Sequence, residues 1–139
     1  MGDGGGRLGP IDHIGVAVAS LDRALAFWRD ALGAPAGPPE EVASEGVRVA
    51  FLPLGESRIE LLEALGDDSP VARFIARKGE GIHHVCLRVA DLKTALEDLK
   101  RRGAEIVPPE IRIGAGGRRI AFVHPRSTGG VLLELKEVP

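Results

Sequence analysis

Two histidines and two glutamates occupy matching places in an internal repeat, and their side chains are suited to binding a metal ion. His13 lies in the run IDHIGVAV and His84 in the run GIHHVCLRV, 84 − 13 = 71 positions further on. The same shift aligns RVAF at 48–51 with RIAF at 119–122, and Glu60 meets Glu134 after three extra residues. Such repetition indicates two copies of one structural unit. Because imidazole and carboxylate groups bind divalent first-row metals, each copy supplies one ligand of each kind.

The elements that would position these side chains follow from the hydrophobic pattern. Residues 11–18 and 82–89 alternate as strands do, with His13 and His84 on the face opposite the main aliphatic side chains. Each strand leads into a predicted amphipathic helix with an N-cap residue and a terminal glycine. These capping pairs are Ser20 with Gly33 and Asp91 with Gly103.

Three more strands are predicted after the helix in each copy. The first is an edge strand marked by prolines, which cannot donate to a central ladder, and the other two form a hairpin. The edges run towards Val42 in the first copy and over 106–109 in the second, and the hairpin strands are 47–54, 57–63, 118–124 and 131–136. The fold class expected is α+β, with two tandem βαβββ modules forming a curled, mostly antiparallel sheet trough and the helices outside.

The domain organisation expected is a disordered leader over 1–10 and one domain over 11–139. Within the domain, module one spans 11–65, a connector helix spans 66–80, and module two spans 81–138. All four ligand-type side chains should face the trough, where they could hold Mn, Co, Ni, Fe or Zn with positions open for a substrate.

Composition argues against several classes of partner. The 139 residues carry a net charge of −2, so neither nucleic acid nor an anionic membrane is an expected partner. No apolar run is long enough for a membrane span, and the start lacks the apolar core of a signal peptide. The one cysteine, Cys86, cannot form an intrachain disulfide, which suits a cytoplasmic location.

Other polar residues have simpler interpretations. His83 aligns with Asp12 and is expected outside the metal's direct ligands, and His124 is expected to cap a turn. Cys86 is expected to be a small buried thiol, whereas Arg88 could contact an anion or end a strand in solvent. The glycine-rich run 113–119 could cradle an anion beside its arginines, or could simply be a hairpin loop.

The chain resembles the vicinal oxygen chelate superfamily and, within it, the methylmalonyl-CoA epimerase family. The resemblance covers 11–138 and depends on several runs taken together: DHIGVAV, VAFLPLG, IELLE, GEGIHH, GAGG and HPRSTGGVL. It implies an isomerase that interconverts (2R)- and (2S)-methylmalonyl-CoA through a metal-stabilised enolate. It also implies His13, Glu60, His84 and Glu134 as ligands of a divalent ion, with Co²⁺ favoured over Ni²⁺, Mn²⁺ or Zn²⁺.

The resemblance further implies that Glu134 is both a ligand and a proton acceptor. Some members of the family carry a glutamate where Val49 stands here, so the second acid/base stays open among Glu45, Glu60 and a water molecule. The acyl-CoA is expected near the glycine-rich loop. The residues expected to bind it are Gly114, Gly116, Gly117 and Arg119.

Two other functions share the fold, a glyoxalase I and a ligand-sequestering module, and the four retained ligand-type residues argue against the second. A glyoxalase I, or lactoylglutathione lyase, can use a similar His, Glu, His, Glu set, although the run HPRSTGG favours the epimerase. A ligand-sequestering module of the bleomycin-resistance kind would need none of the four ligands. A homodimer is expected because exposed sheet edges commonly associate.

Overall fold

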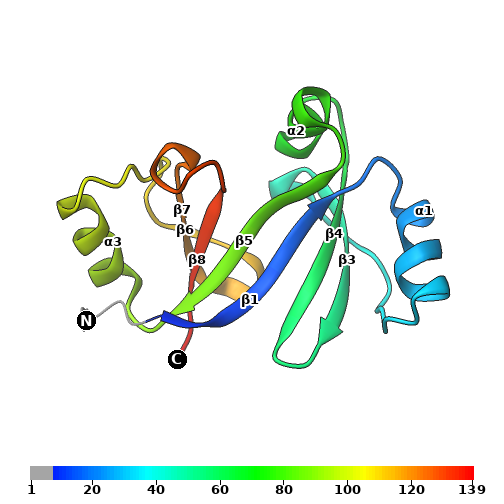
Figure 1. Ribbon diagram of the computed structural model, residues 1–139, viewed down its shortest axis with the longest axis horizontal. Helices are drawn as coiled ribbons and strands as arrows, with labels where there is room; N and C mark the ends of the chain where they lie inside the picture. The colour runs from blue at the N-terminus through cyan, green and yellow to red at the C-terminus, as the bar shows by residue number, and fades with distance from the viewer. Residues whose placement is uncertain (1–7) are drawn as a thin grey trace. The chain divides into compact units, whose positions relative to one another are not determined.

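The computed structural model describes residues 8–139, whose strands fall into two groups of four (Figure 1). One unit comprises His13–His83, and the other comprises 8–12 together with 84–139. The strand order is β2-β3-β4-β1 in the first unit and β5-β8-β7-β6 in the second. No helix within 8–139 is long and apolar enough to cross a membrane.

The first unit contains the predicted strands in the predicted relation to one another. β1 (Leu8–Ala17) pairs in parallel with β4 (Ser57–Ala64), and β3 (Val47–Leu54) pairs antiparallel with β4 and with β2 (Glu40–Val42). Gly55 has a φ of 64°, a value that favours glycine and lets the chain turn tightly between β3 and β4. The predicted hairpin and edge strand are therefore confirmed.

The helix after β1 begins as predicted and then changes its winding. Ser20 caps α1 (Leu21–Leu25) by accepting a hydrogen bond from the backbone N–H of Arg23. Leu21 and Leu25 pack with the aliphatic face of β1 and with β3 and β4. From Ala26 to Ala31 the chain forms a π-helical segment, η1, whose wider turn leaves Leu32 58% exposed. Leu32, which recurs at helical spacing with Leu21 and Leu25 in the sequence, therefore does not share their buried face.

The connector helix also has a packing role that the sequence did not indicate. α2 (Pro70–Lys78) is capped by Ser69, whose hydroxyl accepts hydrogen bonds from the N–H groups of Val71 and Ala72. Its apolar side packs on the sheet face opposite α1, the face that carries His13 and Glu60. This cluster contains Val71, Phe74 and Ile75 from α2, and Ala17, Val49 and Leu62 from the strands.

The second unit repeats the plan with a longer hairpin connection. β5 (Gly81–Val89) is parallel to β8 (Leu133–Glu137), and β7 (Arg119–Val123) is antiparallel to β8 and to β6 (Arg112–Ile113). Asp91 caps α3 (Leu92–Arg101), which packs against β7 and β8. The short helical turns η2 (Ala43–Glu45), η3 (Ala115–Gly117) and η4 (Pro125–Ser127) lie in the loops. Two βαβββ modules of the α+β class, mostly antiparallel, are thus confirmed.

Two predicted boundaries need correction. Residues 1–7 of the expected leader 1–10 lie outside the described residues. Residues 8–10 form the start of β1. A Cβ placed on Gly9 would lie 3.4 Å from the Cβ of Arg88, so this glycine lies close against β5. In the second module the edge strand is β6 rather than 106–109, where Ile106 makes only an isolated bridge to Val123. Pro108 and Pro109 cannot donate to a ladder.

Candidate metal centre and substrate site

The first unit brings His13 and Glu60 together from neighbouring parallel strands. Gly15 is paired with Glu60 in the register of β1 and β4, so Glu60 lies diagonally beside His13 on the same face. His13 Nδ1 is 3.3 Å from Glu60 Oε2. Both residues are buried, with exposed fractions of 4% and 9%.

The second unit builds the same pair in the same way. Cys86 is paired with Glu134 in the register of β5 and β8, so Glu134 again lies diagonally beside the histidine two residues earlier. His84 Nε2 is 3.3 Å from Glu134 Oε1, and both residues are buried. The repeat in sequence therefore corresponds to a repeat in register, and each unit holds one His–Glu pair.

The chemistry and spacing of each pair fit a divalent metal ion. A ligand nitrogen or oxygen lies about 2.0–2.2 Å from zinc, so two ligands on one ion are about 3.0–3.4 Å apart in tetrahedral or octahedral geometry. The observed 3.3 Å falls in this range and is longer than a charge-assisted hydrogen bond, about 2.7–2.9 Å.

Each glutamate faces a phenylalanine on the neighbouring antiparallel strand. Phe51 is opposite Glu60 in the β3–β4 register, and Phe122 is opposite Glu134 in the β7–β8 register. An arginine guanidinium lies over each ring, 5.1 Å from its centroid for Arg58 on Phe51 and 5.2 Å for Arg112 on Phe122. These arginines were missed from the sequence, although the aligned runs RVAF and RIAF contained both rings.

A buried ion cluster was also missed. Asp12 is 3% exposed, and its carboxylate lies 2.8 Å from Arg88 Nε and 3.4 Å from Lys136 Nζ. The cluster therefore joins β1, β5 and β8 within the second unit. It gives Arg88 a partner inside the protein, which neither interpretation of Arg88 from the sequence had included.

The secondary candidates mostly have the structural roles expected of them. His83 is half-buried with its ring 5.0 Å from that of Phe74, and Cys86 is a fully buried free thiol. His124 Nδ1 accepts from the N–H of Arg126, so the prediction that it caps a turn is confirmed. Val49 is buried in the cluster beneath α2.

The loop that contains Arg126 is held by an ion pair. The guanidinium of Arg126 donates to the carboxylate of Glu105, with Nη2 2.9 Å from Oε2. This hydrogen bond, helped by the positive charge, lowers the pKa of Glu105 below its usual value. This ion pair therefore ties the run HPRSTGG to Glu105.

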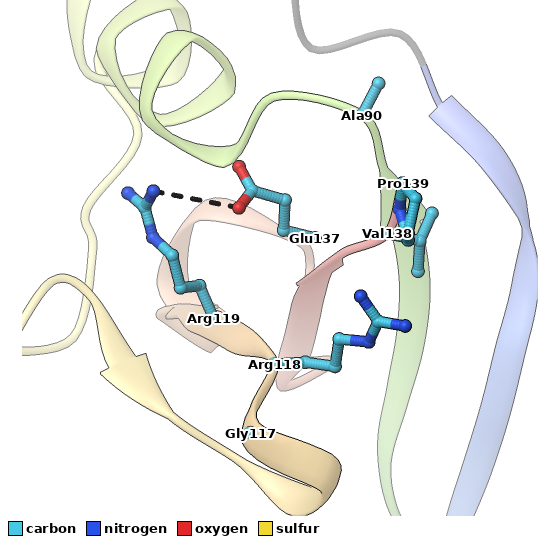
Figure 2. A pocket seen from close by; sticks show the side chains of 7 residues that line it. All are labelled: Ala90, Gly117, Arg118, Arg119, Glu137, Val138 and Pro139. Carbon is cyan, nitrogen blue, oxygen red and sulfur yellow. Dashed lines mark ion pairs between the residues drawn. The ribbon is translucent and has the colours of Figure 1, made fainter.

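The glycine-rich loop borders a pocket of about 410 Å³ in the second unit (Figure 2). Gly117 and Arg119, both predicted to bind substrate, line the pocket together with Arg118. In Figure 2 the side chains of Arg119 and Glu137 point towards each other, and their charged atoms are 3.7 Å apart. The remaining lining residues are Ala90, Val138 and Pro139.

The other two glycines predicted to bind substrate have backbone reasons for being glycine. A Cβ on Gly114 would lie 2.8 Å from Cδ1 of Ile120, a contact too close without movement. Gly116 has a φ of 71°, in the left-handed region that other residues rarely adopt. Neither glycine is among the residues that line the pocket in Figure 2.

Comparisons with known proteins agree with this fold. Residues 12–122 match the Glyoxalase/Bleomycin resistance protein/Dioxygenase superfamily, and the chain belongs to that superfamily. It is 44% identical over 132 residues to the mitochondrial methylmalonyl-CoA epimerase of Bos taurus, covering 94% of this chain and 75% of that one. It is 40% identical to the ethylmalonyl-CoA/methylmalonyl-CoA epimerase of Cereibacter sphaeroides, covering 94% and 99%.

A solved structure gives the same result. A methylmalonyl-CoA epimerase in complex with methylmalonyl-CoA and NH₄⁺ superposes with a TM-score of 0.86 at 36% identity, covering 94% of this chain and 95% of that one. Within the superfamily, the chain therefore belongs to the methylmalonyl-CoA epimerase family.

Proposed function

We propose that this protein is a metal-dependent isomerase that interconverts (2R)- and (2S)-methylmalonyl-CoA. The observation that carries the proposal is the duplicated, buried His–Glu pair, with 3.3 Å between donor atoms in each unit. The family relationship supplies the substrate, because the bovine relative is a methylmalonyl-CoA epimerase and the Cereibacter sphaeroides relative is an ethylmalonyl-CoA/methylmalonyl-CoA epimerase.

The metal ligands proposed are His13, Glu60, His84 and Glu134. Co²⁺ is the first choice, and Ni²⁺, Mn²⁺ and Zn²⁺ suit the same nitrogen and oxygen donors. When bound, the ion would act as a Lewis acid towards negative charge that develops on the thioester oxygen.

Glu134 is the proposed proton acceptor for the hydrogen on C2. Its carboxylate is buried and lies beside His84 Nε2, which holds the group in place. Inversion at C2 needs a second group that returns a proton from the opposite face.

The second proton-transfer group is proposed among Glu45, Glu60 and a water molecule. Val49 cannot serve, since its side chain has no ionisable group. Glu60 already accepts a hydrogen bond from Arg58 Nε at 2.9 Å, and its Oε2 lies 3.3 Å from His13 Nδ1. Glu45 is exposed and ends the turn η2, which Gly46 closes at a φ of 68°. The variant Glu45→Gln should therefore be tested first.

The CoA portion is proposed to lie along the loop that contains Gly114, Gly116, Gly117 and Arg119. Support comes from the adjoining pocket, where Arg118 and Arg119 could attract phosphate groups. A homodimer is proposed because the edge strand β6 exposes Ile113. A cytoplasmic location is proposed because the sole cysteine is a free thiol.

The decisive assay measures exchange of the C2 hydrogen of methylmalonyl-CoA with deuterium from solvent, with and without a chelator. The proposal expects exchange that stops on chelation and returns with Co²⁺. Exchange that persists without metal would remove the metal from the mechanism. Turnover of methylglyoxal hemithioacetal without C2 exchange would support a glyoxalase, and binding without any turnover would support a sequestering module.

A further inference from the structure

The guanidinium of Arg112 lies near the His84–Glu134 pair of the second unit, with the Phe122 ring as their common neighbour. Its guanidinium lies over the ring of Phe122, and that ring is opposite Glu134 in the β7–β8 register. The Phe122 ring also meets the His84 ring edge to face, with centroids 6.4 Å apart. β6, β7 and β8 can be followed side by side in Figure 1. Arg112 is therefore separated from both proposed ligands by one aromatic ring.

The side chain of Arg112 is anchored but not fully hydrogen-bonded. Its Nη2 donates to the carbonyl of Pro108 at 3.1 Å and approaches that of Pro109 at 3.5 Å. Its Nε is buried and has no hydrogen-bond partner among the residues that the structure describes. A buried N–H without an acceptor is costly, so such a group calls for a partner.

The first unit shows what an arginine in this environment does when its partner lies within the protein. Arg58 covers Phe51 as Arg112 covers Phe122, but Arg58 Nε donates to Glu60 at 2.9 Å. The units also differ in charge at their edges. Glu40 is paired with Val49 in the first unit, whereas Arg112 is paired with Ile120 in the second. The two units therefore differ at this position: the second unit has a cation, Arg112, on the strand face that carries His84 and Glu134.

We propose that Arg112 binds an anionic oxygen of the acyl-CoA, and that this oxygen belongs to the free carboxylate of the acyl group. The inference rests on the proposed function and adds a residue that selects acyl groups bearing a carboxylate. A guanidinium fixed over a ring presents its N–H groups in a set direction, which suits a carboxylate. Phosphate groups of CoA also carry anionic oxygens. They are the alternative source of the bound oxygen, because β6 leads into the glycine-rich loop where the CoA portion is proposed to lie.

The test measures ligand binding by calorimetry for the metal-loaded wild type, Arg112→Met and Arg112→Lys. Arg101→Met is the matched control, since it removes one positive charge from the exposed face of α3. Three ligands separate the possible sources of the oxygen. Methylmalonyl-pantetheine has the carboxylate without the nucleotide phosphates, free CoA has the phosphates without the acyl group, and propionyl-CoA lacks only the carboxylate.

We expect Arg112→Met to bind methylmalonyl-pantetheine about 10- to 100-fold more weakly, with free CoA and propionyl-CoA unchanged. Arg112→Lys should recover part of the loss, and Arg101→Met should match the wild type. Equal weakening of free CoA would overturn the assignment to the carboxylate and give the phosphates instead. Unchanged binding of all three ligands would overturn any role for Arg112, whereas a wild type that binds no CoA ester would overturn the proposed function itself.

Discussion

Metal binding by the two His–Glu pairs should be measurable as thermal stability, and His84→Ala should abolish the effect. A ligand that binds only the folded state, present at 100 times its Kd, stabilises that state by about 2.7 kcal/mol. For a chain of this length, each kcal/mol raises Tm by about 4 °C. Saturating Co²⁺ should therefore raise the Tm of the wild type by about 10 °C over the chelated protein.

The substitution removes a nitrogen that lies 3.3 Å from Glu134 Oε1. If the affinity for metal falls about 100-fold, the stabilisation at the same metal concentration falls to about 0.4 kcal/mol. The shift in Tm should then shrink to about 2 °C. Metal analysis after desalting should find about one ion per chain in the wild type and little in the variant.

His83→Ala is the matched control, because the neighbouring histidine packs its ring 5.0 Å from that of Phe74. It should lower the Tm of the chelated protein slightly and keep the full shift with metal. If His83→Ala lost the shift as completely as His84→Ala, the assignment of ligands by strand alternation would be wrong. A wild type whose Tm does not respond to any divalent ion would refute the metal site.

Three further predictions concern the framework around the site. Ser69→Ala should lower the free energy of unfolding by about 1 kcal/mol in urea titrations, because it removes the cap of α2, and an unchanged value would argue against the cap. Hydrogen bonds from Thr94 lower the pKa of Asp91 below its usual 3.8, so the stability this carboxylate contributes is present above that pH and is lost as pH falls through the lowered pKa. Asp91→Asn should therefore lose less stability than the wild type on acidification below about pH 4, and equal slopes would contradict this. Asp12→Asn should cost about 3 kcal/mol by leaving Arg88 beside a neutral group, and a loss under about 0.5 kcal/mol would show that the buried cluster is not stabilising.

Local patterns in the sequence were sufficient to predict most elements of each unit. Strand alternation placed the aliphatic residues of β1 against α1, and capping residues fixed where α1, α2 and α3 begin. These features depend on neighbours within about four positions, so they can be recognised without knowing the fold. The winding of η1 could not be predicted, because residues 26–31 fit an ordinary helical pattern.

Contacts between distant parts of the chain were the ones that sequence reasoning missed. Asp12 meets Arg88 across 76 positions and Lys136 across 124. The packing of α2 over Val49 and the position of Arg112 over Phe122 are likewise set by how elements assemble. No periodicity marks such partners, because each depends on the register and packing of strands that the chain brings together only on folding.

The sequence by itself determined that His13 and His84, and Glu60 and Glu134, are equivalent residues of a repeated module. Only the tertiary structure decided that each histidine meets its own glutamate, at 3.3 Å and out of water. The physical reason is strand register. In each unit the glutamate is paired with the residue two places after the histidine, on a parallel strand whose position depends on the crossover connection and the core.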